Sequence, residues 1–165
     1  MKLDEVQSAM AAFLCENGID AMAGWPDARR ERLTGPTVLV LLDGLSCSPA
    51  GMQDYLGQRQ DESTGQWEEL YGRRAQVIFH LDVLAPERSS AQECRQTANE
   101  LARLFQTERP GALTVQELRL DEPEHDEKRG LLRLRCVLTC TGIVCTAGQE
   151  AGTFLDFTLR GDVKI

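Results

Sequence analysis

Residues 76–84 read Gln76-Val77-Ile78-Phe79-His80-Leu81-Asp82-Val83-Leu84, and strongly apolar side chains recur at every second position from Val77 to Val83. Neighbouring side chains of a β-strand point to opposite faces, so this alternation is typical of a strand with one face buried in a core. The pattern remains compatible with a strand back to Trp67. We therefore predict one long strand from Trp67 to Leu84.

A second strand-compatible segment, Met52–Arg59, precedes this strand. The residues between them, 60–66, are polar and include Gly65, a composition that favours a turn. We expect a long β-hairpin whose outer part extends beyond its sheet, where an isolated pair of strands is only marginally stable in water. Such an arm is predicted to contact a partner, and the alternative is a mobile surface loop. The expected contact residues are Tyr55, Trp67, Tyr71, Arg73 and Arg74.

Further strands are expected on both sides of the hairpin. Thr37–Leu42 is a short apolar run that predicts a buried strand, and Asp43-Gly44 after it predicts a turn. Leu113–Leu120 alternates without a clear inward face, and the acidic residues 121–127 predict an exposed turn. Alternation is clearest over residues 132–141, and Phe154–Leu159 is expected to be a final edge strand. The expected inward side chains of residues 132–141 are Leu132, Leu134, Cys136, Leu138 and Cys140.

Two segments have the apolar periodicity of amphipathic helices. The first runs from Leu3 to Asn17 and ends at Gly18, a common helix stop. The second begins after Ser90-Ala91-Gln92-Glu93, which has the form of a capping box, and runs to about Thr107. Short strand connections favour antiparallel pairing, and two helices need one face to cover. The predicted fold class is α+β, a mainly antiparallel sheet with two helices packed on one face and a long projecting β-hairpin.

Composition limits the function classes. The 165 residues fit one domain, 1–165, and the formal net charge of −8 argues against binding to a phosphate backbone. The longest strongly apolar run, Val38–Leu42, is too short to cross a bilayer. The start of the chain lacks the pattern of a secretory signal, so we expect a cytoplasmic protein with reduced thiols.

No set of residues predicts a catalytic, cofactor or metal site. Cys136, Cys140 and Cys145 are the strongest candidates, but the first two lie on one strand, about 13 Å apart, too far to share a zinc ion. Buried thiols are the simpler interpretation. No cysteine is placed beside His80 or His125 in the way that nucleophilic catalysis requires. The acidic residues 121–127 lack the glycine and the alternating ligands of a calcium loop.

Three stretches together resemble small proteins of tailed phages and prophages, of the tail-terminator or tail-completion kind. They are Ala23–Arg30 leading into Val38–Leu41, Tyr55–Gly57 through Trp67–Arg73 to Phe79–Pro86, and Phe154–Phe157.

The resemblance implies a minor tail protein without enzymatic activity or cofactor. It implies a hexameric ring that caps the tail tube, with the tail-tube protein and the head–neck connector as partners. The protein would act in the host cytoplasm during assembly and then in the virion tail. The alternatives are a head–tail joining or tail-tube protein and, in another class, a thiol- or metal-dependent enzyme using Cys136, Cys140 or Cys145.

Overall fold

The structure, a computed structural model, describes residues 3–24, 33–50, 54–60, 63, 65–127, 130–147 and 158–159. Its elements in chain order are α1 (Leu3–Glu16), β1 (Ala21–Ala23), β2 (Thr37–Pro49), β3 (Tyr55–Gln60), β4 (Trp67–Pro86), α2 (Ala91–Thr107), β5 (Thr114–Leu120), β6 (Glu124–Asp126), β7 (Leu131–Leu134), β8 (Cys136–Ala147) and β9 (Thr158–Leu159). All these strands belong to one sheet, in which β1 and β2 are parallel and the other pairs are antiparallel. The predicted α+β class and mainly antiparallel sheet are confirmed.

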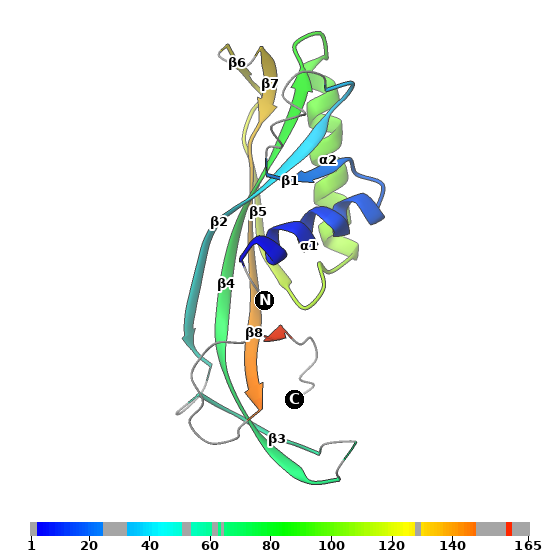
Figure 1. Cartoon of the computed structure of the whole chain (residues 1–165). Helices are drawn as coiled ribbons and strands as arrows, with labels where there is room; N and C mark the ends of the chain where they lie inside the picture. The colour runs from blue at the N-terminus through cyan, green and yellow to red at the C-terminus, as the bar shows by residue number, and fades with distance from the viewer. Residues whose placement is uncertain are drawn as a thin grey trace.

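Strand β4 is the centre of the sheet (Figure 1). Along one edge it pairs first with β3, over residues 67–71, and then with β2, over residues 73–84. Along the other edge it pairs with β8 over residues 70–80 and with β7 over residues 83–86. The alternation of apolar residues in β4 therefore organises most of the fold.

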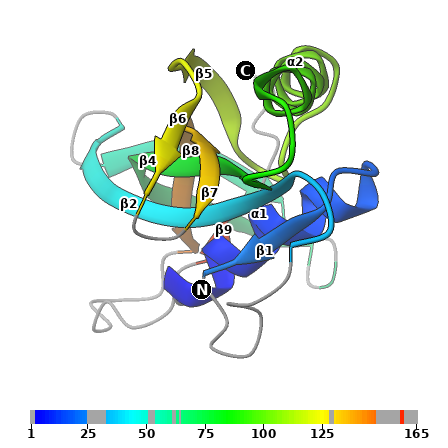
Figure 2. The same ribbon diagram turned by 90° about the horizontal axis from the view of Figure 1, so that it is seen from above.

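Both helices contribute to one hydrophobic core on one face of β4. Met10 and Leu14 of α1 and Cys94 and Leu101 of α2 are buried in the same cluster as the inner residues of the sheet. Those inner residues include Val77, Phe79, Leu81, Val83, Leu132, Leu134, Cys136, Leu138 and Cys140, and all of them are at most 4% exposed. The predicted inward face of residues 132–141 is confirmed, as is the packing of both helices on one face. Helix α2 follows the long axis of the molecule, whereas α1 crosses it (Figure 2).

The helix ends match their sequence signals. Gly18 has φ 80°, its amide donates to the carbonyl of Cys15, and the amide of Ile19 donates to the carbonyl of Leu14. These two bonds form a Schellman motif, which satisfies carbonyls at the end of α1. At the start of α2 the capping box is present, with Ser90 and Glu93 bonded in both directions.

Several predicted boundaries are wrong. Asp43-Gly44 is not a turn, because β2 continues to Pro49. The register shifts between Leu42, opposite Phe79, and Gly44, opposite Ile78, so Asp43 is the extra residue of a β-bulge. The edge of the long strand β4 keeps β2 extended where the local sequence favours a turn.

Three other differences concern the positions of strands. The acidic turn at 121–127 contains β6, which pairs with β7, and the strand expected over 132–141 is divided at Arg135 into β7 and β8. The short parallel strand β1 was not predicted. The bulge between Val115 and Glu117 explains why β5 shows no single inward face, since an extra residue moves the following side chains to the other side.

Some predictions concern residues that the structure does not describe. Met52 and Gln53 of the expected first hairpin arm, residues 25–30 of the first resembling stretch, and Phe154–Phe157 all lie outside the described residues. Thr158 and Leu159 form β9 on β8, as part of the expected final strand.

Candidate functional site at the hairpin tip

The predicted hairpin exists. Among the described residues, β3 pairs with β4 from Tyr55, opposite Tyr71, to Gln60, opposite Trp67. Gly65, with φ 70°, lies before the second arm, and its carbonyl accepts a 3.0 Å hydrogen bond from Nε2 of Gln60. Residues 67–69 of β4 pair with β3 alone among the described strands. We call Tyr55–Gln60 together with Trp67–Tyr71 the hairpin tip.

The hairpin tip lies at the end of the sheet opposite the helices (Figure 1). Trp67, Tyr71 and Arg73 have the same parity along β4 as Val77 and Phe79, so they continue the face that the helices cover further along. Arg74 points to the opposite face. Four of the five predicted contact residues therefore lie on one face of the sheet: Tyr55, Trp67, Tyr71 and Arg73. Only the fifth, Arg74, lies on the other face.

Two aromatic side chains of the hairpin tip are exposed. Trp67 is 67% exposed and Tyr55 is 42% exposed. The rings of Tyr55 and Tyr71 meet edge to face, with centroids 5.7 Å apart, which fixes Tyr55 in place. The hydroxyl of Tyr71 donates a 2.6 Å hydrogen bond to Oε2 of Glu69. This bond favours the protonated phenol and raises the pKa of Tyr71.

One ion pair lies near the turn of the hairpin tip, and a second ion pair and a residue with positive φ lie at its base. Nε of Arg73 donates a 3.1 Å hydrogen bond to Oδ2 of Asp54, and Arg59 lies 3.7 Å from Glu68 across the two strands. Asp54 has φ 61°, a conformation that few residues other than glycine adopt. Its other oxygen, Oδ1, is buried without a hydrogen-bond partner. Backbone strain of this kind persists only where surrounding contacts hold it, and it occurs often at functional positions.

The cysteines that were the strongest candidates for a catalytic or metal site are buried. Cys136 and Cys140 are both 0% exposed, and burial raises the pKa of each thiol to about 12. His80 lies on the opposite face of β4, where its Nε2 is 3.5 Å from Oδ2 of Asp43. Cys145 is a residue of β8 whose side chain lies outside the described part. Over the described ranges, no cluster of three or more His, Cys, Asp or Glu residues could hold a metal ion.

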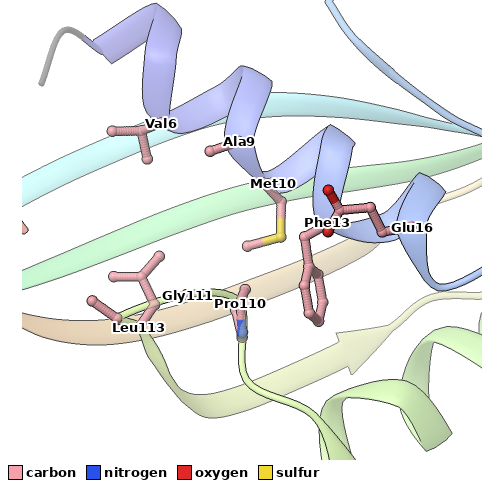
Figure 3. A pocket seen from close by; sticks show the side chains of 9 residues that line it. Val6, Ala9, Met10, Phe13, Glu16, Pro110, Gly111 and Leu113 are labelled. Carbon is pink, nitrogen blue, oxygen red and sulfur yellow. The ribbon is translucent and has the colours of Figure 1, made fainter. Parts of the chain in front are cut away.

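An apolar groove, which the sequence did not predict, lies between α1 and the turn that joins α2 to β5 (Figure 3). Its volume is about 370 Å³, and its lining is largely apolar. Val6, Ala9, Met10 and Phe13 come from α1, and residues 110–113 from the turn. Pro110-Gly111 signals only the end of a helix in the sequence, and no local pattern shows that this turn lies against α1.

Comparison with known proteins does not identify a family. No protein-family model matches the chain, and no curated protein matches it either. In the part of the chain that the structure describes, none of the helices is both long and apolar enough to span a membrane.

Proposed function

We propose that this protein is a structural component of a phage or prophage tail, a tail terminator. In this proposal it forms a ring that caps the tail tube and joins it to the head–neck connector. It acts in the host cytoplasm during assembly and stays in the virion tail.

The observation that carries the proposal is the sheet that extends beyond its helices and exposes Trp67 and Tyr55 at the far end. Trp67 is the most exposed large apolar side chain in the described part of the chain, and leaving it in water is unfavourable for an isolated domain. Trp and Tyr are also the residues that most often dominate the binding energy of protein interfaces. A protein that works by assembling with other proteins would use this surface for contact.

The alternative enzyme class has less support. A cysteine nucleophile or metal ligand acts as a thiolate, and a thiol with a pKa of about 12 is protonated near neutral pH. Cys136 and Cys140 are also closed off from solvent by the core. Both side chains fit a packing role.

The test combines the purified protein with tail-tube protein. We expect light scattering after size exclusion to give a closed oligomer, and electron microscopy to show rings at one end of each tube, with tube growth arrested. A variant with residues 61–66 and their flanks replaced by a short turn should lose assembly while its unfolding transition changes little.

Other outcomes would separate the alternatives. A protein that remains monomeric at high concentration, even with tail-tube protein present, contradicts the proposal. Polymerisation of this chain into tubes by itself would indicate a tail-tube protein. Binding to the connector without any effect on tube growth would indicate a head–tail joining protein.

A further inference from the structure

We infer that the hairpin tip of one copy inserts Trp67 into the apolar groove of a second copy, and that this contact builds the ring. The inference rests on the proposed self-assembly and names the surfaces that carry it. The two surfaces in this contact are the hairpin tip, with Trp67 and Tyr55, and the groove between α1 and residues 110–113.

The two surfaces match in chemistry and size. The groove floor includes Met10 and Leu113, which are 2% and 6% exposed, and exposed Ala9 and half-buried Phe13 form its upper wall on α1. A volume of about 370 Å³ lies at the low end of the range for sites that enclose small molecules, so it suits one aromatic side chain. Burying a Trp side chain removes about 150–250 Å² from water.

The tip cannot reach the groove of its own chain. The amide of Leu42 donates to Oε1 of Gln7, which places α1 beside Leu42, and Leu42 pairs with Phe79. Phe79 and Trp67 are twelve residues apart on the continuous strand β4. At about 3.3 Å per residue, this is about 40 Å along the strand. The other wall of the groove ends beside Thr114, which is level with Gln76 in the sheet, nine residues or about 30 Å from Trp67. A Trp67 side chain in this groove must therefore come from another copy.

Charge near the two surfaces is compatible with one orientation. On the face of Trp67, β4 carries exposed Glu69 and, four residues further along, Arg73, which is 44% exposed. The groove is lined by exposed Glu16, and exposed Arg109 precedes Pro110 in the chain. An acid and a base on each side allow both opposite-charge contacts in one relative orientation, which fixes the direction of docking.

A contact between two different surfaces determines how further copies can add. A contact between a tip and a groove leaves one free groove and one free tip, so further copies add in the same direction. Such a head-to-tail contact closes into a ring when the rotation between neighbours allows it. The arrangement of the two surfaces on one chain is therefore suited to cyclic assembly.

The test uses full-length variants that disable one surface each. Trp67→Ala removes the indole side chain that inserts into the groove. Ala9→Trp fills the groove with a side chain from α1. Each should weaken self-association on the order of 30-fold or more, as expected for the central anchor of an interface. The matched controls are Ser8→Trp, on the exposed side of α1 outside the groove, and Leu45→Ala, which removes another exposed apolar side chain. Both controls should keep the wild-type mass.

Mixing the two defective variants gives the sharpest result. The tip of Ala9→Trp and the groove of Trp67→Ala are intact, so the mixture should form a one-to-one dimer that cannot grow. Sedimentation velocity distinguishes this dimer from rings and monomers, and circular dichroism verifies that each variant is folded.

Three results would overturn the inference: wild-type assembly by Trp67→Ala, wild-type assembly by Ala9→Trp, or a mixture without the dimer. If rings form in all variants, the proposed ring stands and only this contact is wrong. A monomeric wild-type chain contradicts both.

Discussion

At the scale of single residues, burial determines the chemistry of the thiols. Cys136 and Cys140 share one face of β8 with Leu138, and the sheet places both in the core beneath the helices. The pKa of each rises to about 12, mainly because burial disfavours the thiolate. Cys15 and Cys47 are exposed. The same residue type thus lies in two different environments in one chain.

Alkylation should separate these two classes. Iodoacetamide at pH 8 is expected to modify Cys15 and Cys47 in the native protein and to leave Cys136 and Cys140 intact until the chain is unfolded. Peptide mapping by mass spectrometry measures each site. Rapid native labelling of Cys136 or Cys140 would show that the described core is wrong.

The raised pKa values of these two thiols predict that the folded protein is less stable in alkali. Their folded pKa lies above the ordinary value of 9.0, so their contribution to stability is complete below about pH 9. It is lost as the pH rises toward about 12, because the unfolded chain releases these protons first. The free energy of unfolding, measured with urea, should fall more over this pH interval for the wild type than for a Cys136→Ala, Cys140→Ala double variant. Equal slopes would contradict the assignment.

A buried ion pair connects β4 to β7. Asp82 is 1% exposed, and its Oδ2 accepts hydrogen bonds from Nε of Arg133, at 2.9 Å, and from Nη2. Its Oδ1 has no hydrogen-bond partner. Arg133→Ala should destabilise the fold by about 3 kcal/mol, because it leaves a buried carboxylate unpaired.

The partner substitution provides the control for this pair. Replacing both residues, as Asp82→Leu with Arg133→Met, should recover most of the lost stability in urea unfolding, because no buried charge remains. A double variant as unstable as Arg133→Ala would show that the loss comes from packing.

At the scale of secondary-structure elements, local signals worked best at helix ends. Gly18 and the Ser90–Glu93 capping box act through bonds within a few residues, so the sequence alone reveals them. Strand boundaries were predicted less well. Asp43-Gly44 favours a turn locally, yet β4 pairs with residues on both sides of it and keeps them in β2.

The N-cap of α2 can be tested by one substitution. Ser90→Ala removes the oxygen that accepts from the amide of Glu93, at 3.3 Å, and should cost about 1 kcal/mol in urea unfolding. Ser89→Ala, one residue earlier and outside the capping box, should change stability by less than about 0.5 kcal/mol. Similar losses in both variants would argue against a specific cap.

At the scale of the whole molecule, the sheet has two unlike halves. One half lies under α1 and α2 and contains the buried core, whereas β3 and the start of β4 extend beyond the helices (Figure 1). Residues 67–69 pair on one edge only among the described strands, and four of the six residues of β3 are exposed. Local stability should therefore fall along β4 toward Trp67.

Hydrogen exchange measures this gradient. In an assembly-defective monomer, the amides of the hairpin tip should exchange at least about 100-fold faster than those of Val77–Val83, because few buried contacts oppose their opening. In the assembled wild type the tip should become protected. Uniform protection of β4 in the monomer would contradict the two-part description.

The sequence by itself determined the class of fold, the inward face of β4 and β8, and the two helices, because alternation and helical periodicity are local consequences of which side chains are buried. It also placed Tyr55, Trp67 and Tyr71 on a hairpin. Only the tertiary structure decided that β2 takes over from β3 along β4 and that α1 and residues 110–113 enclose a groove. These features depend on contacts between segments far apart in the chain, for which no local pattern exists. The aromatic tip was visible in the sequence, but the groove that could receive it arises only when the chain folds.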